Sequence, residues 1–98
     1  MNIKGVFYFD PSDRIYADHF PGKPVVSGSL IIHAFLNALK KEGVNEVQYI
    51  IENFRFREFV SPGEYPFNIE IDQNKMKCRL FRSSSEILKP IATGIIRK

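Results

Sequence analysis

The chain has 98 residues, 44% of them hydrophobic, a formal net charge of +3 and a single cysteine. This length suits one small domain with a thin core, so we expect a single domain over residues 1–98. Short apolar runs interrupted by charge argue against a membrane span, and the first residues lack the apolar core of a signal peptide. Basic residues are spread along the chain rather than clustered with aromatics, which argues against nucleic acid as a partner. The lone Cys78 cannot form an internal disulfide, which suits a reducing cytoplasm.

The first half of the chain predicts a strand, a shaped loop and a helix. Residues 3–9 are typical of a strand that the turn cluster at 10–13 ends. Residues 14–27 form a loop whose prolines and glycine constrain its backbone. From 28 to 42 apolar residues recur at helical spacing, with Ser27 as the N-cap and a glycine directly after the last turn.

Beyond the helix the apolar period changes to two, and a turn is expected at 61–64. In the strand after the helix the apolar positions change from odd to even numbers near 50–53, which predicts a β-bulge or a sharp bend. The pattern predicts four strands, over residues 46–60, 65–72, 75–82 and 87–97.

The helix is apolar on nearly every side, so we expect it to be buried on most sides by a sheet that curls about it. One helix followed by an antiparallel meander is an α+β arrangement, with the sheet wrapped around one long central helix. The polar exceptions Ser29, His33 and Asn37 stand four apart on one stripe. An open sheet edge and surplus apolar surface predict a dimer.

The junction between loop and helix carries the candidate chemistry. Residues 17–34 read ADHFPGKPVVSGSLIIHA. They hold His19 in a rigid loop that runs into the helix, as in proton-transfer sites, although a loop histidine can also simply bond the backbone. Gly28 begins the helix, where N–H groups without internal partners can stabilise negative charge on a carbonyl oxygen. A simple capping role for Gly28 is the alternative.

This stretch resembles the signature HFPGxPVxPGxLIIEA of the 3-hydroxyacyl-acyl-carrier-protein dehydratases. The motifs Phe54-Arg55-Phe56-Arg57 and Pro62-Gly63-Glu64 extend the resemblance over nearly the whole chain. The resemblance implies a hotdog fold and a cytoplasmic enzyme of fatty-acid or related lipid synthesis that needs no cofactor. It also implies a 3-hydroxyacyl chain on an acyl carrier protein as substrate, and a homodimer whose subunits share the site, with a higher oligomer or a heterodimer with a paralogue as alternatives.

The same resemblance implies roles for individual residues. His19 matches the catalytic base, and the N–H of Gly28 matches the donor to the thioester oxygen. Position 33 matches the catalytic carboxylate of the family, where this chain carries His33. Substrate-positioning roles are expected for Phe20, Gly22 and Asn37.

His33 leaves three functions open. An imidazole can give a proton to a departing hydroxyl near neutral pH, but it supplies no negative charge. The chain is therefore expected to be a dehydratase in which His33 is the proton donor. The alternatives are a catalytically degenerate subunit that binds acyl chains, and a hotdog thioesterase in which His33 positions water.

The charged residues of the strands suggest a partner surface but no metal. Acyl carrier proteins are acidic, so the resemblance implies a basic rim, for which Arg79 and Arg82 are the candidates. A solvated strand face is the alternative. Neither His19 nor His33 has a cysteine or carboxylate at ligand spacing, so no metal site is expected.

Overall fold

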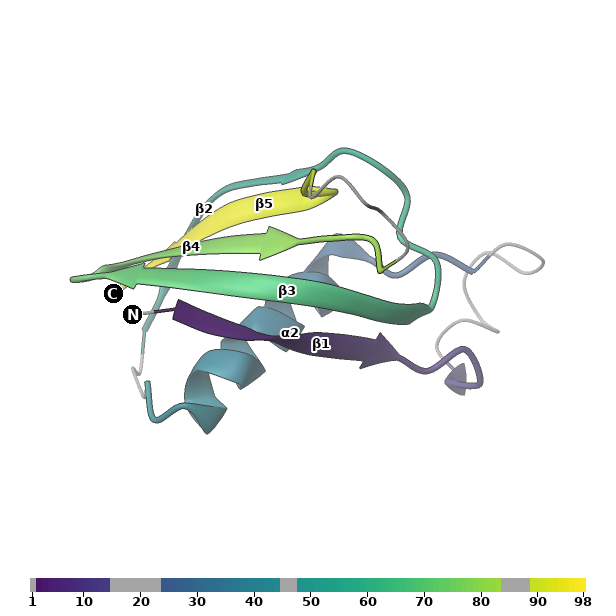
Figure 1. Cartoon of the computed structure of the whole chain (residues 1–98), viewed down its shortest axis with the longest axis horizontal. Helices are drawn as coiled ribbons and strands as arrows, with labels where there is room; N and C mark the ends of the chain where they lie inside the picture. The colour runs from purple at the N-terminus through teal and green to yellow at the C-terminus, as the bar shows by residue number, and fades with distance from the viewer. Residues whose placement is uncertain (1, 15–23, 45–47, 84–88) are drawn as a thin grey trace.

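A computed structural model describes residues 2–14, 24–44, 48–83 and 89–98. These ranges contain one long helix, α2, and an antiparallel sheet (Figure 1). The elements are β1 (Asn2–Phe9), α2 (Gly28–Lys41), β2 (Ile50–Phe56), β3 (Gly63–Asp72), β4 (Lys75–Leu80) and β5 (Ala92–Arg97).

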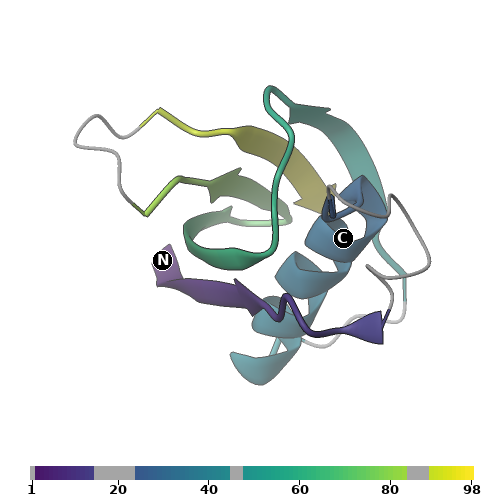
Figure 2. The same ribbon diagram turned by 90° about the vertical axis from the view of Figure 1, so that its right-hand side faces the viewer.

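The sheet wraps around the helix. Its strand order is β1-β3-β4-β5-β2, and every neighbouring pair is antiparallel. In the view turned by 90°, the strands curve about α2, which lies in their concavity (Figure 2). The predicted architecture is therefore confirmed. The order leaves β1 and β2 as the two edge strands.

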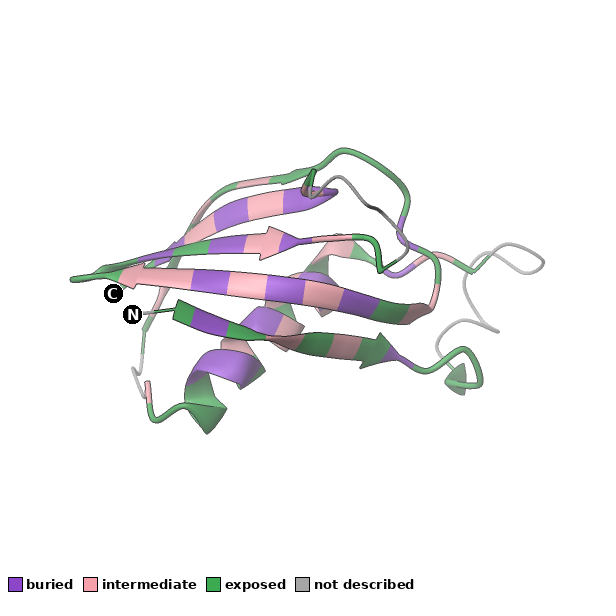
Figure 3. Ribbon diagram, viewed as in Figure 1, coloured by how far each residue is buried: buried purple, intermediate pink, exposed green. Residues whose placement is uncertain are grey.

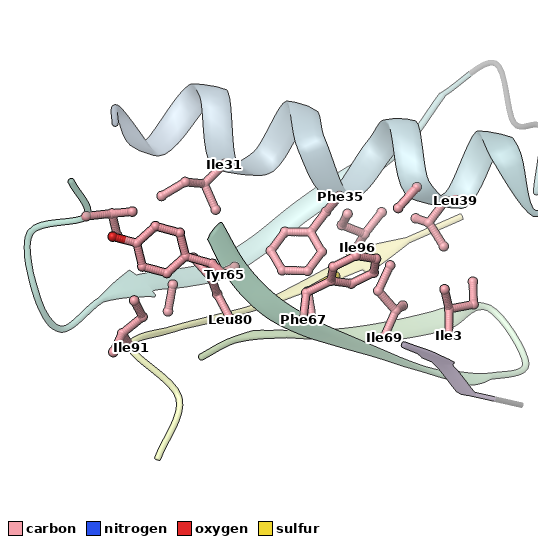
Figure 4. Close-up of a cluster of buried hydrophobic side chains, with 14 of the residues drawn as sticks. Ile3, Ile31, Phe35, Leu39, Tyr65, Phe67, Ile69, Leu80, Ile91 and Ile96 are labelled. Atoms are coloured by element: carbon pink, nitrogen blue, oxygen red, sulfur yellow. The ribbon is translucent and has the colours of Figure 1, made fainter. Parts of the chain in front are cut away.

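The core lies between α2 and the concave face of the sheet, here called the inner face. Ile31, Phe35 and Leu39 point from α2 into it (Figure 4). Buried residues alternate with half-buried ones along β3 and mostly with exposed ones along β4, as the two-residue period predicted (Figure 3). The Phe35 ring stands edge-on to Phe7 and Phe67, with centroids 5.0 and 5.9 Å away. Each fully buried large side chain contributes about 1.5–3 kcal/mol to folding.

The predicted β-bulge is present in β2. The register against β5 shifts between Glu52 and Arg55, and Asn53 takes a positive φ of 53°. Before the bulge Ile51 faces inward opposite Ile96, and after it Phe56 faces inward opposite Ala92. The extra residue therefore explains the change from odd to even apolar positions.

Replacing Gly94 by alanine is expected to destabilise the fold. The Phe54 ring lies directly over Gly94, in the space that a Cβ atom would need. Overpacking of this kind costs about 1–3 kcal/mol of unfolding free energy, which denaturant titration measures. The double variant Phe54→Leu/Gly94→Ala should recover part of that loss. An unchanged stability of Gly94→Ala would contradict the packing.

Several strand ends differ from the prediction. β2 ends at Phe56 rather than at 60, and β3 begins at Gly63, inside the predicted turn. β4 ends at Leu80, and β5 begins at Ala92 rather than at 87, although 87 and 88 lie outside the described residues. The chain leaves the sheet after Phe56 because the Val60 carbonyl accepts the Val26 N–H, 2.7 Å away, just before α2.

Cys78 is a buried core residue. Burial raises the pKa of its thiol to about 12, against a smaller opposite effect of the Arg79 charge. We therefore expect a thiol reagent at pH 8 to label native protein far more slowly than unfolded protein. Since the ordinary thiol pKa is 9.0, stability should fall as pH rises from there toward 12. Equal labelling rates with and without denaturant would contradict this.

Candidate active site

The start of α2 is fixed by the cap that the sequence predicted. Ser27 has extended backbone angles, and its Oγ accepts the Leu30 N–H at 3.3 Å. Its carbonyl accepts the Ile31 N–H at 3.2 Å. Within the described part of the chain the Gly28 N–H has no hydrogen-bond partner. It stands at the positive end of the helix dipole, so it can donate to an oxygen that gains negative charge.

The ring of Phe56 packs against Gly28 from the neighbouring edge of the sheet. A Cβ atom on Gly28 would stand 2.9 and 3.0 Å from two carbons of that ring. Glycine is therefore needed for the ring to lie so close to the helix terminus. No motif in the sequence pairs Phe56 with Gly28. The one signal for their contact is the predicted bulge, which turns Phe56 inward. Phe56 and the Gly28 amide together form a wall of the candidate site.

His33 and Asn37 are one turn apart on the exposed side of α2. The buried side of the helix, formed by Ile31, Phe35, Ala38 and Leu39, faces the sheet. We expected a helix buried on most sides. In the single chain α2 is buried only on the side that faces the sheet. His33 lies five residues after Gly28, about 7.5 Å along the helix axis. His33 is exposed and Gly28 is half-buried, and both lie in the first half of α2.

The remaining predicted residues lie elsewhere or are not described. His19, Phe20 and Gly22 fall outside the described residues. Arg79 lies on β4 and pairs with Glu70 at 3.4 Å, and Arg82 pairs with Glu58 at 3.1 Å. The hydrogen bond and charge of Glu58 raise the pKa of Arg82. Arg79 stands opposite Thr93, on the sheet face away from α2, so it is not near His33.

The inner face of edge strand β2 is incompletely covered. Ile51 and Phe56 face the core side of the sheet, yet they are 41% and 40% exposed. On the other edge strand the exposed apolar residues Val6 and Tyr8 alternate with the inward-facing Phe7 and Phe9. The core side of β2 is therefore left partly uncovered next to the start of α2.

The described residues also bear on metal binding and on membrane-spanning helices. Among those residues no group of histidine, cysteine and carboxylate side chains is arranged to hold a metal ion. No described helix has the length and apolarity needed to cross a membrane.

A curved antiparallel sheet wrapped around one long helix defines a hotdog domain. The model of the ApeI-like family, described as ApeI dehydratase, matches residues 1–94. The chain therefore belongs to the ApeI-like dehydratase family. The solved dehydratase heterocomplex ApeI:P from Xenorhabdus doucetiae has the same fold, with a TM-score of 0.75 and 19% identity over 98% of this chain and 85% of that chain.

Curated relatives agree with this membership. The 3-hydroxyacyl-[acyl-carrier-protein] dehydratase FabZ of Janthinobacterium sp. (strain Marseille) is 33% identical over 96 residues, 87% of this chain and 56% of that protein. The FabZ of Wolbachia pipientis wMel is 40% identical over 70 residues, 63% of this chain and 47% of that protein. The chain thus spans about half the length of the curated relatives it matches.

Proposed function

We propose that this protein dehydrates 3-hydroxyacyl thioesters carried on an acyl carrier protein. The observation that carries the proposal is the Gly28 N–H at the capped start of α2, which has no partner among the described residues, with Phe56 against it and His33 exposed further along the same helix. Membership of a dehydratase family supports the reaction type. No cofactor is required, because elimination of water needs only proton transfers and stabilisation of an enolate.

In the proposed reaction His19 takes the proton from C2 of the substrate. Negative charge then develops on the thioester oxygen, which accepts the Gly28 N–H. The C3–O bond breaks as His33 gives its proton to the departing hydroxyl, and the products are an enoyl thioester and water. His19 ends protonated and His33 neutral, so one proton must return from His19 to His33 through solvent before the next turnover.

The proposal includes a homodimer that pairs through β2. A second copy at this edge would cover Ile51 and Phe56 and would complete the core beside Gly28. The resemblance implies that His19 of one subunit would then act with His33 of the other. A heterodimer with a paralogue is the alternative arrangement. It merits a test because the similar solved structure is a dehydratase heterocomplex. A cytoplasmic location stays a prediction that rests on the lone cysteine.

The test is turnover of a 3-hydroxyacyl carrier protein by the purified chain. We expect an enoyl thioester as product, detected by mass spectrometry, and its loss in His19→Ala. A free thiol as product would establish the thioesterase alternative instead. Tight binding of the acyl carrier protein without turnover would support the degenerate acyl-binding subunit, which the histidine at position 33 specifically favours.

Carrier-protein binding is expected to weaken steeply with salt. Exposed charges attract an acidic partner over a range that salt shortens to about 8 Å at physiological ionic strength. Charge reversal at Arg82 should slow association more than it speeds dissociation, as surface plasmon resonance can measure, whereas charge reversal at Arg79, on the sheet face away from α2, should not. An affinity that is the same at low and high salt would contradict a basic docking surface.

A further inference from the structure

The outer face of the sheet, the face away from α2, contains a hollow of about 360 Å³ over strands β2, β5 and β4. Four cationic side chains line it, and no carboxylate is among its described lining residues. Its polar lining consists of Asn53, Arg55, Arg57, Lys77, Arg79 and Thr93. The hollow takes no part in the proposed dehydration, because the sheet separates it from α2.

The strand register centres the hollow on one hydroxyl between two guanidinium groups. Arg55 on β2 and Arg79 on β4 both stand directly opposite Thr93 on β5. Neighbouring strands are about 4.8 Å apart, so the two arginine Cα atoms are separated by about 10 Å. Long arginine side chains can converge across that distance above the short threonine. Arg57 and Lys77 continue the positive charge along β2 and β4, in opposite directions from this row.

The four cations of the hollow are less closely paired with carboxylates than two arginines outside it. Arg97 pairs with Glu52 at 2.8 Å and Arg82 with Glu58 at 3.1 Å. In the hollow Arg79 pairs only with Glu70, at the longer distance of 3.4 Å, and all three pairs are similarly exposed. Such an exposed pair contributes little.

Within the described ranges Arg55, Arg57 and Lys77 make no ion pair with any residue. Like charges held this close repel one another unless an anion lies between them. The hollow therefore has the charge, the donors and the space for a small anion.

We propose that this outer-face hollow binds a phosphate group. A guanidinium matches two phosphate oxygens with two parallel N–H donors, and here one stands on each side of the site. The Thr93 hydroxyl supplies a donor between them. A tetrahedral, doubly charged phosphate can accept hydrogen bonds from the cations of both β2 and β4. A planar carboxylate has one charge and fewer oxygens, so it would pair with these cations less completely.

The test is binding of pyrophosphate to the purified full chain, measured by calorimetry at low ionic strength. We expect saturable binding that weakens about tenfold in Arg55→Gln and in Arg79→Gln, since each removes charge-assisted hydrogen bonds. Arg97→Gln is the matched control: it removes the same charge from the same face outside the hollow, and should change the affinity less than about twofold. Circular dichroism checks that each variant is folded.

Absence of saturable binding would overturn the proposal. An equal loss in Arg97→Gln would also overturn it, because the attraction would then be the diffuse positive field of the face. Comparison of pyrophosphate with 4′-phosphopantetheine distinguishes the source of the phosphate. Tighter binding of 4′-phosphopantetheine assigns the site to the arm of a carrier, and equal binding assigns it to a free phosphate. All these measurements omit the acyl substrate, so the proposed dehydration can fail without affecting them.

Discussion

His33→Glu is expected to raise the rate of dehydration by at least about tenfold, because a correctly placed general acid or base contributes about 10²–10⁴ to a rate. Position 33 lies on the exposed side of α2, so the less bulky carboxylate fits without repacking the core. The substitution restores the residue type that the resembled dehydratases carry there. The measurement is enoyl thioester formation at saturating substrate. His33→Gln, which has the shape of glutamate without its charge, is the matched control.

His33→Ala separates the two accounts of the natural residue. An active wild type and an inactive alanine variant would make the imidazole the proton donor. Equal inertness of wild type and alanine variant, with activity in His33→Glu, would make the natural protein an acyl-binding subunit. Full activity in His33→Ala would exclude any chemical role for position 33.

The elements of the fold that depend on local periodicity could be predicted from the sequence. The α2 helix, its Ser27 cap and its end at Gly43, where φ is +86°, follow from neighbouring residues alone. The bulge in β2 is predicted by a change of phase within one strand. In the candidate site the free amide of Gly28 follows in the same way, because every helix leaves its first N–H groups without partners.

Features that need strands to be aligned with one another could not be predicted. The contact of Phe56 with Gly28 joins residues 28 positions apart, and only the bulge and the path of β2 bring them together. The row of Arg55, Thr93 and Arg79 depends on two strand registers. The residue pattern within each strand indicates basic residues, but it does not show which of them lie side by side. Strand ends were also misplaced, because backbone hydrogen bonds such as that between Val26 and Val60 decide where the chain leaves the sheet.

Ile51→Lys is expected to convert the dimer into a monomer and to abolish turnover. Ile51 lies on the core side of edge strand β2 and is 41% exposed, where a second copy would cover it. In a two-fold dimer each substitution acts twice, and each buried, unpaired ammonium costs several kcal/mol. The dimer dissociation constant should rise at least about a hundredfold. Light scattering measures the mass, and the enoyl thioester assay measures activity.

Val6→Lys is the matched control for this prediction. Val6 is an apolar residue of the other edge strand, 59% exposed and not on the core side. The same change there should leave both the dimer and its activity intact. A dimeric Ile51→Lys would show that the subunits associate through another surface, and a monomeric Val6→Lys would locate that surface at β1. A monomer with full activity would disprove the shared site, because His19 of one subunit could not then act with His33 of the other.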